Sequence, residues 1–310
     1  MTRWRPLGGG LAAILLLVAS CGLAQSTEQR GTLIAARLVL GGPADCPTLP
    51  FCLKDLRERY GLRFKAFRAL DAQGPLTKAA LDRGDIQVAR LLSSDGAIPA
   101  NGYVVLNDDK RLAIANNVVP IARANLAAEA QGVLDELNGR LTTADLAAMN
   151  KSAETDGRAP DRVAAEYLQK SGLKPTTSSR KGKITVGGLN TSESVILAQL
   201  YGQALKGLGY EVSFRLDLGA REEVEPALER GDIDLYPGYA ASELEFLNRG
   251  KGEARTDISA TIDRLDQYLR PKGLIALTPS RAQDQPAFVV TKQTADRYHL
   301  VDLSDLSRRV

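Results

Sequence analysis

The feature that most constrains this chain is an internal repeat. Its clearest pair of segments reads Ala-Leu, an acidic residue and then Arg-Gly-Asp-Ile in both copies. Because the segments recur in the same order at nearly constant spacing, together they constrain the fold far more than any one match does. Three pairs match: residues 38–42 with 184–188, 70–71 with 216–217, and 80–86 with 227–233.

Each copy of the repeat predicts the same series of elements. An apolar strand ends at Gly-Gly and is followed by an amphipathic helix, which in the second copy begins near Thr191. A second strand is expected at 63–67 or 211–215, and then a helix that stops at Arg-Gly. The Asp-Ile pair opens a third strand, at 86–91 or 233–236. This order is typical of a doubly wound parallel sheet, so we expect an α/β protein with two similar lobes and a ligand cleft between them.

Composition and charge exclude several classes of protein. Of 310 residues, 44% are hydrophobic and 25% are charged, which is the balance of a globular protein rather than of collagen or a disordered chain. With 40 basic and 37 acidic residues the chain is almost neutral, which argues against nucleic acid as a partner. One histidine and three cysteines disfavour a metal site, and the sequence has no phosphate-binding loop and no nucleophile elbow. We therefore predict that the protein is not an enzyme and needs no cofactor.

The N-terminal segment indicates export from the cytoplasm. Two arginines precede an apolar run at 11–19, and small residues follow it. This pattern is typical of a secretory signal, and the run is short for a membrane span. We therefore expect residues 1–20 to be removed.

A cysteine stands directly after the small residues of the signal. Val-Ala-Ser-Cys resembles the lipobox of bacterial lipoproteins, which implies that Cys21 is lipidated and becomes the first mature residue. A tether over 21–36 would then hold the protein at the outer face of the cytoplasmic membrane. The alternative is ordinary signal cleavage near Ala24, which would discard the cysteine.

The other two cysteines, Cys46 and Cys52, lie six residues apart. Thiols oxidise outside the cytoplasm, so we expect a disulfide that closes a small loop. Two free thiols, as in a cytosolic protein, are the alternative that the signal segment disfavours.

Several short segments carry a resemblance to one family. They are Leu-Val-Leu-Gly-Gly-Pro at 38–43, Ser-Ser-Asp-Gly at 93–96, Asn-Val-Val-Pro at 117–120, Val-Gly-Gly-Leu-Asn-Thr-Ser-Glu at 186–193, Gly-Asp-Ile-Asp-Leu-Tyr-Pro at 231–237 and Leu-Ser-Asp-Leu at 303–306. Together they resemble the substrate-binding proteins of osmoprotectant ABC transporters. The resemblance implies a type II periplasmic-binding-protein-like fold, in which two doubly wound lobes are joined by two crossover strands.

The same resemblance implies a function. A small quaternary-ammonium solute, such as glycine betaine, choline or carnitine, would bind between the lobes and pass to an ABC permease with its ATPase subunit. Two alternatives stay open: a binding protein for another small polar solute, or a ligand-sensing module that is not coupled to transport.

The order of the segments differs from the family's usual order. Relatives usually begin with a segment like 183–190, pass through one like 288–306, continue into one like 38–109 and end like 117–173. The chain therefore resembles a circular permutant in which 174–183 links the family's usual ends, although a rearranged gene that folds poorly is an alternative. The expected parts are lobe 2 from 38–109 plus 288–310, lobe 1 from 118–280, and crossovers at 110–117 and 281–287.

A stretch with two tyrosines is the first candidate for ligand contact. We expect a strand to end there, and ligands bind at the carboxyl ends of parallel strands. Aromatic faces attract quaternary ammonium groups, so Tyr236 and Tyr239 are candidate contacts, and the resemblance implies Asp234 together with Tyr236. The alternative is that both tyrosines are core or surface residues. Gly238 and Ala240-Ala241 depart from the family's usual Glu and Thr-Gly, which leaves the solute open.

Polar residues at other strand ends complete the candidate site. Asn190 and Thr191 lie where a helix begins, and free N–H groups there suit a carboxylate. The alternative is a simple N-cap, with Glu193 completing a capping-box-like pair. Ser94 and Asp95 follow a strand of the other lobe, and an N-cap is their alternative too. The candidates on the crossovers are Asn117, Asp284 and Gln285.

Overall fold

The computed structural model of the chain describes residues 31–72, 74–173, 180–216 and 218–310. The expected signal segment, Cys21 and most of the tether lie outside the described residues, as does most of the expected linker at 174–183. Within the described ranges, no helix is both long enough and apolar enough to cross a membrane.

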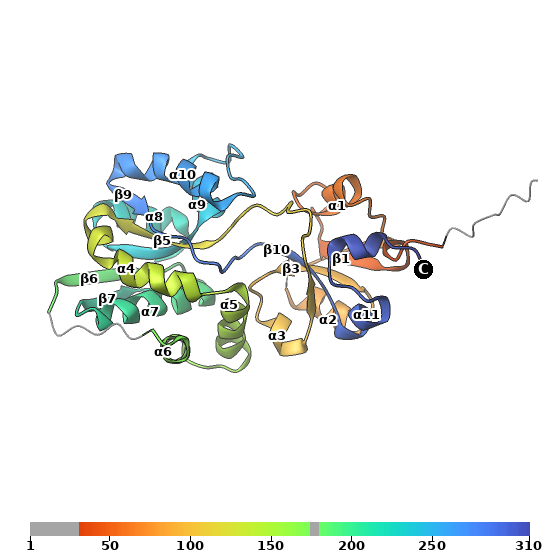
Figure 1. The fold of residues 1–310 in the computed structure, drawn as a ribbon, viewed down its shortest axis with the longest axis horizontal. Coiled ribbons are helices and arrows are strands. Elements are labelled where there is room, and N and C mark those ends of the chain that lie inside the picture. Colours follow the sequence, from red (N-terminus) through yellow and green to blue (C-terminus); the bar gives the residue numbers. More distant parts are fainter. Residues whose placement is uncertain (1–30, 73, 174–179, 217) are drawn as a thin grey trace, which may run out of the picture. The chain divides into compact units, whose positions relative to one another are not determined.

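Two five-stranded sheets form the framework (Figure 1). One contains β1 (Val39–Pro43), β2 (Ala66–Leu70), β3 (Val88–Leu92), β4 (Val104–Leu106) and β10 (Pro286–Val290). The other contains β5 (Val118–Arg123), β6 (Lys183–Gly187), β7 (Glu211–Arg215), β8 (Leu235–Tyr239) and β9 (Leu274–Ala276). The strand orders correspond: β2-β1-β3-β10-β4 in the sheet of lobe 2, and β7-β6-β8-β5-β9 in the sheet of lobe 1.

Each sheet is mixed rather than parallel throughout. β1 pairs in parallel with β2 and β3, and β6 with β7 and β8. β10 runs antiparallel to β3 and β4, and β5 runs antiparallel to β8 and β9. The reason is that β5 and β10 each follow a crossover, so they start at the sheet edge where the parallel strands end. The α/β fold with two similar lobes is confirmed, while these two strands depart from the parallel sheets that the sequence predicted.

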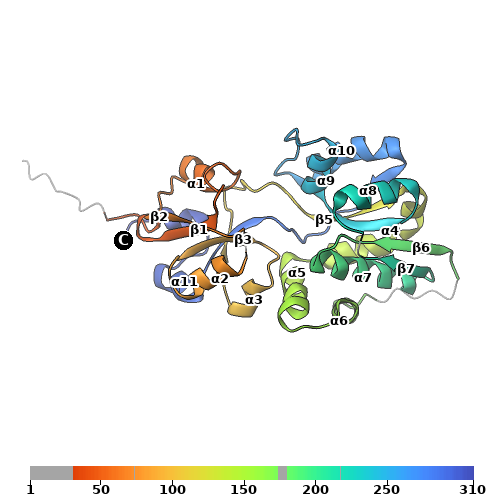
Figure 2. The same cartoon turned by 180° about the vertical axis from the view of Figure 1, so that it is seen from behind.

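Helices cover both faces of the sheets. Lobe 2 has α1 (Leu53–Arg59), α2 (Pro75–Asp82), α3 (Ala97–Asn101) and α11 (Lys292–Tyr298). Lobe 1 has α4 (Ala124–Arg140), α5 (Thr143–Asn150), α6 (Pro160–Ser171), α7 (Ser192–Gly207), α8 (Arg221–Arg230), α9 (Ala240–Leu247) and α10 (Ile258–Leu269). In lobe 1, α4 to α7 pack on one face and α8 to α10 on the other (Figure 2). The side chains of β5 alternate accordingly: Val118 and Ala122 enter the first core, and Val119 and Ile121 the second.

The repeated Gly-Gly and Asp-Ile segments pack against each other in both lobes. A Cβ atom added to Gly41 would lie 2.4 Å from Cδ1 of Ile86, and one added to Gly187 would lie 2.4 Å from Cδ1 of Ile233. Such distances leave no room for a side chain at either strand position. Two parts of the sequence repeat are therefore one packing unit, in which a buried isoleucine lies against a glycine of the neighbouring strand.

The repeated Arg-Gly ends the second helix of each copy. Gly84 and Gly231 have φ of +75° and +79°, a left-handed conformation that glycine adopts freely. Beyond the stop, the N–H groups of Asp232 and Ile233 still donate to the carbonyl of Ala227. β3 and β8 therefore begin two residues later than the sequence predicted. β2 also begins later than predicted, at Ala66 instead of Arg63, whereas β7 occupies its predicted range.

The segments that follow β4 and β9 run between the lobes side by side. Asn117 and Gln283 pair as an antiparallel bridge. The N–H of Asp284 donates to the carbonyl of Asn116 at 3.1 Å, and Asn116 Nδ2 donates to the carbonyl of Asp284 at 2.6 Å. The lobes are thus joined by a hydrogen-bonded two-stranded ribbon rather than by two independent linkers.

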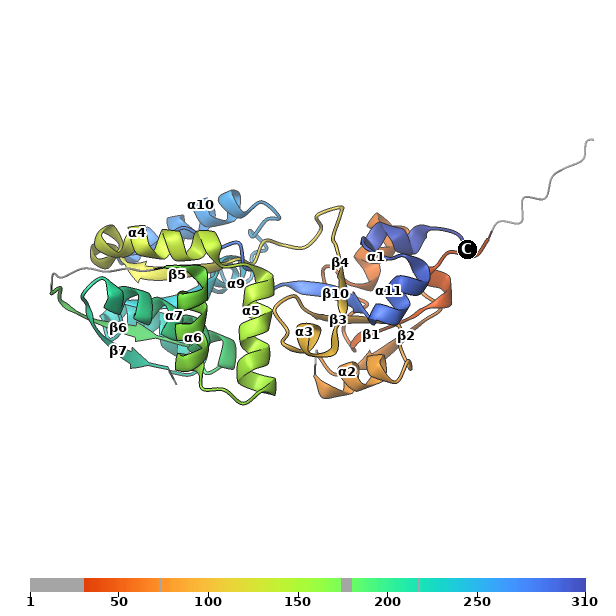
Figure 3. The ribbon, with the colours of Figure 1, turned by 60° about the horizontal axis from the view of Figure 1, so that its bottom comes forward.

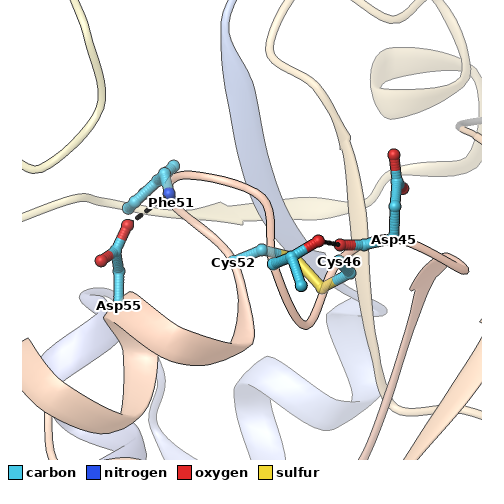
Figure 4. The surroundings of a disulfide bond; sticks show 6 residues. Asp45, Cys46, Phe51, Cys52 and Asp55 are labelled. Carbon is cyan, nitrogen blue, oxygen red and sulfur yellow. Dashed lines mark hydrogen bonds between the residues drawn. A yellow bond between two sulfur atoms is a disulfide. The ribbon is translucent and has the colours of Figure 1, made fainter.

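A disulfide joins Cys46 and Cys52, whose Cα atoms are 5.4 Å apart (Figure 4). It closes the loop between β1 and α1, and both cysteines are buried. Within this loop Phe51 has φ of +46° and donates its N–H to Asp55 Oδ2 at 2.5 Å. The ring of Phe51 packs edge-on against Phe288 of β10, with the centroids 5.3 Å apart. The disulfide loop is therefore anchored on the sheet of lobe 2.

Candidate functional site

A cavity of about 430 Å³ is lined by both lobes and one crossover; we call it the interlobe cavity. Lobe 2 contributes Ala72, Lys78, Leu92, Ser94 and Asp95, the crossover contributes Asp284, and lobe 1 contributes Asn150, Glu154, Leu189, Thr191, Ser192, Glu193, Arg221, Tyr239 and Ser242. Leu92 and Tyr239 are the last residues of β3 and β8. The cavity therefore lies at the carboxyl ends of parallel strands, where open α/β sheets bind ligands.

A larger cavity, about 730 Å³, is confined to lobe 2. Its walls include Leu38 and Val39 at the start of β1, and Gln87 just before β3. These are the amino ends of the strands, opposite to the usual ligand edge of such sheets. We therefore place the candidate site in the interlobe cavity.

Helices of the two lobes meet beside the interlobe cavity. α5 of lobe 1 lies next to α3 of lobe 2 (Figure 3). After α5 the chain continues as a π-helical turn, Lys151–Thr155, a kind of turn that is frequent at functional sites. Gly96, just before α3, lies against the backbone of this π-helical turn: a Cβ added to it would lie 2.6 Å from the backbone nitrogen of Lys151. Asn150 of α5 bridges the lobes, because its Nδ2 donates to the carbonyl of Ser94 at 2.8 Å.

Glu193, in the first turn of α7, is the centre of the hydrogen bonds in the cavity. The hydroxyl of Tyr239 donates to its Oε1, and Asn150 Nδ2 donates to its Oε2 at 2.5 Å. The hydroxyl of Ser94 donates to Oδ1 of Asp284 at 2.8 Å. Two carboxylates thus face the cavity, each held by neutral donors.

Burial raises the pKa of both carboxylates. Burial, and after it the negative charge of Asp284, raise the pKa of Glu193 to about 7, against the lowering effect of the bonds from Tyr239 and Asn150. Burial also raises the pKa of Asp284. Glu154 follows the same pattern, since burial and the charge of Asp95 raise its pKa.

The basic side chains of the cavity already have acidic partners. Lys78 Nζ lies 2.8 Å from Asp95 Oδ2, and Arg221 Nε lies 2.8 Å from Oε2 of Glu243, which is fully buried. Neither base forms an ion pair with Glu193. The cavity presents more acidic than basic charge to whatever enters it.

Tyr239 lines the interlobe cavity, but Tyr236 does not. Tyr236 has no exposed surface and lies in the core between the sheet and α8–α10, with its hydroxyl 3.5 Å from Glu225 Oε2. The physical reason is the period of the strand: residues three apart point to opposite faces. The interpretation of Tyr236 as a ligand contact is corrected accordingly.

Asp234 also lies away from the interlobe cavity. β8 begins at Leu235, so Asp234 precedes the strand instead of ending it. Its Oδ2 accepts the N–H of Thr185 at 2.8 Å, which ties the middle of β6 to the start of β8. The expectation that Asp234 lies at a carboxyl strand end is wrong, because the preceding Asp-Ile pair belongs to the helix stop and not to the strand.

The other sequence-predicted residues divide into two groups. Those that line the interlobe cavity are Ser94, Asp95, Thr191 and Asp284, and those that do not are Asn117, Asn190 and Gln285. Asn117 is buried in the crossover ribbon, where its Nδ2 donates to the carbonyl of Ser280 at 2.8 Å. Asn190 is exposed, and Gln285 pairs with Ser93 through its backbone.

Thr191 caps α7, but Glu193 does not complete a capping box. The hydroxyl of Thr191 accepts the N–H of Ser194 at 3.3 Å, so Ser194 occupies the position that such a box requires. Glu193, one residue earlier, turns its carboxylate into the interlobe cavity instead.

Sequence reasoning missed part of the polar lining. Asn150, Glu154, Lys78 and Arg221 were not singled out, because each lies on a helix or turn whose facing surface the sequence does not reveal. For Glu193 alone the sequence held a usable signal of a cavity residue: a carboxylate in the first turn of a helix that follows a strand.

The sequence of this chain matches a known family over most of its length. The model of OpuAC, the substrate binding domain of ABC-type glycine betaine transport system, matches residues 35–170 and 182–310. The chain belongs to this family. The resemblance that the short segments carried is thereby confirmed.

Curated relatives align with part of the chain. A glycine-betaine-binding protein of Pseudomonas aeruginosa is 28% identical over 125 residues, 40% of this chain and 39% of the relative. The glycine betaine-binding protein YehZ of Escherichia coli is 25% identical over 126 residues, 40% of this chain and 41% of the relative. The carnitine transport binding protein OpuCC of Listeria monocytogenes is 28% identical over 120 residues, 38% of each. The aligned stretch thus spans about two fifths of these relatives.

Solved structures of solute-binding proteins are more distantly similar. A substrate binding domain of a putative amino acid ABC transporter from Streptococcus pneumoniae has a TM-score of 0.41 at 11% identity, covering 87% of this chain and 90% of that one. Tv2483 bound to L-arginine has a TM-score of 0.37 at 13% identity, covering 88% and 83%.

Proposed function

We propose that this protein is the solute-binding component of an ABC importer, acting outside the cytoplasmic membrane. It takes up a small solute in the interlobe cavity and delivers it to a permease that an ATPase subunit drives. Membership of the OpuAC family supports this role. The observation that carries the proposal is the cavity itself, because its walls come from two lobes joined by a ribbon and can close on a ligand.

The proposed solute carries a positive charge and belongs to the glycine betaine, choline and carnitine class. Among the described residues, Glu154, Glu193 and Asp284 line the interlobe cavity without an ion pair to Lys or Arg. Tyr239 adds an aromatic ring that can hold a quaternary ammonium group. What the curated relatives bind points to the same class.

A binding screen tests the proposal directly. Thermal shift followed by calorimetry with glycine betaine, choline, carnitine and proline betaine should give saturable binding of at least one of them. A charged substitution in the cavity, Ser242→Arg, should abolish that binding, whereas Ser307→Arg on an exposed turn should leave it unchanged. Failure of all four solutes to bind would contradict the solute class.

Membrane attachment through Cys21 is part of the proposal, and it rests on the sequence pattern. Cys21→Ser should release the protein from the membrane fraction or leave an uncleaved precursor, because lipid transfer requires the thiol. Fractionation and labelling with a fatty acid measure this, with Ser26→Ala as the control. Unchanged membrane retention of the Cys21→Ser protein would refute the anchor.

A further inference from the structure

Two buried carboxylates face the interlobe cavity from different parts of the fold. Glu193 comes from α7 of lobe 1, and Asp284 comes from a crossover. In the described part of the chain neither forms an ion pair with Lys or Arg. Their donors are neutral: Tyr239 and Asn150 on Glu193, and Ser94 on Asp284. Among the described residues, no lysine or arginine therefore forms an ion pair with this carboxyl pair.

The other charged groups that line the cavity either already form an ion pair or add negative charge. Lys78 of α2 is held by Asp95, and Arg221 of α8 is held by Glu243. Glu154, on the π-helical turn, is a third carboxyl in the cavity. No side chain of the described protein is thus placed to neutralise both members of the pair.

An independent observation points to a donor on the ligand. Asn150 is 3% exposed and lines the interlobe cavity, and its Nδ2 makes two hydrogen bonds while its Oδ1 has no partner. A buried acceptor without a partner is costly, so its presence in a cavity indicates that a bound molecule supplies the donor. A hydroxyl or N–H group beside the ligand's cationic centre would satisfy it.

We propose that Glu193 and Asp284 receive the cationic group of the ligand, that a net cation with a hydrogen-bond donor is preferred to a zwitterion, and that binding releases a proton from this pair to solvent. The inference rests on the proposed function and names the ligand chemistry of the same cavity. A zwitterion's carboxylate would find both cavity bases already paired.

Proton release follows from the electrostatics of the pair. In the empty cavity, burial and the charge of Asp284 raise the pKa of Glu193 to about 7, so this carboxyl can give up a proton near neutral pH. A cation between them favours the form with both carboxylates ionised, and the displaced proton goes to the buffer. By linkage, the affinity should rise with pH, by up to about tenfold per pH unit where one proton is released, and level off once the pair is ionised.

Calorimetry with a matched pair of ligands tests the proposal. Choline and glycine betaine share the trimethylammonium head, but choline is a cation with a hydroxyl donor and glycine betaine is a zwitterion. We expect choline to bind at least tenfold more tightly at pH 8. Its affinity should fall by about tenfold or more at pH 6, and its heat at pH 6.5 should differ between phosphate and imidazole buffers in proportion to their ionisation enthalpies.

Substitutions that preserve shape separate charge from structure. Glu193→Gln keeps an acceptor for Tyr239 and Asp284→Asn keeps one for Ser94, but each removes a charge. Either variant should weaken choline binding at pH 8 at least tenfold and abolish its buffer-dependent heat. Glu222→Gln and Asp263→Asn, which change exposed carboxyls of α8 and α10, are the matched controls and should change neither.

The outcomes distinguish this inference from the proposed function. Tight binding of choline or glycine betaine with no buffer-dependent heat, or with unchanged affinity in Glu193→Gln, would overturn the inference and leave the function standing. Tighter binding of glycine betaine than of choline would overturn the preference for a net cation. Binding of neither ligand by the folded wild-type protein would overturn the solute class and the inference with it.

Discussion

At the scale of single residues, the interlobe cavity depends on where a few polar side chains are buried. Glu193 entered the sequence analysis only in an alternative, as the partner in a capping-box-like pair, but it lies at the centre of a hydrogen-bonded cluster with Tyr239 and Asn150. Tyr236, which both its aromatic ring and the family resemblance made a candidate contact, is enclosed in the core of lobe 1. Burial, which a single sequence does not report for such residues, therefore separates ligand contacts from structural ones.

The buried carboxyl of Glu193 should make stability depend on pH. Its pKa is about 7 in the folded protein and 4.5 in the unfolded chain, so its contribution is fully present below pH 4.5 and is lost as pH rises through 7. Glu193→Gln removes this loss. Without ligand, the variant should match the wild type at pH 4.5 and exceed it at pH 8, by on the order of 2 kcal/mol. Urea unfolding measures the difference, and equal curves at both pH values would contradict the buried charge.

Tyr236 should matter for stability rather than for ligand contact. Tyr236→Ala leaves a large cavity in a closed core and should cost about 3–5 kcal/mol of unfolding free energy. Tyr236→Phe keeps the ring and should cost much less. Chemical denaturation gives both values, and calorimetry on the folded fraction should show unchanged ligand affinity for the Phe variant. A specific loss of affinity at full stability would restore Tyr236 as a contact.

At the scale of elements, the repeat is explained by close packing between neighbouring strands. Gly41 and Gly187 leave space for Ile86 and Ile233, and the glycine that follows each second helix permits the left-handed stop. The Gly-Gly strand end, the Arg-Gly helix stop and the Asp-Ile segment therefore form the same unit in both lobes. It also places the carboxyl ends of β3 and β8 at the interlobe cavity, since it determines where each strand begins.

A methyl group at a packing glycine should be destabilising. Gly187→Ala would place Cβ 2.4 Å from Cδ1 of Ile233 and should cost about 1–3 kcal/mol. Ile233→Val in the same chain removes that Cδ1 and should recover part of the loss. The matched control is Gly139→Ala, on an exposed helical position with no atom within 4 Å, which should gain about 0.5–1 kcal/mol. Thermal unfolding of all four proteins measures the effects, and a neutral Gly187→Ala would contradict the packing argument.

At the scale of the whole molecule, the two ends of the described core lie together. The N–H of Val310 donates to the carbonyl of Thr32 at 3.1 Å, and the N–H of Ile34 donates to the carbonyl of Arg308 at 2.9 Å. Adjacent ends are the condition under which a chain tolerates circular permutation. A permuted order would leave each relative aligned with one part of the chain, and the curated relatives do align over only about two fifths of their length.

Restoring the family's usual order should leave the fold intact. A chain that begins at residue 180, runs to 310, continues through a short Gly-Ser linker into 32 and ends at 173 keeps every contact between the lobes. We expect its melting temperature to lie within a few degrees of the wild type and its ligand affinity to be unchanged. The control opens the chain at Gly139 inside α4, which should prevent folding. An aggregated or unfolded first chain would contradict the permutation proposal.

The sequence by itself determined the α/β class, the duplicated unit and the helix stops. These features depend on residues close together in the chain, or on glycines whose conformation is nearly independent of context. The tertiary structure alone decided which polar residues meet. Glu193 and Asp284 are far apart in the chain, and they share one cavity only because a crossover returns beside α7. Tyr236 is buried and Tyr239 faces the cavity because the strand begins at Leu235, and that start depends on contacts with the preceding helix.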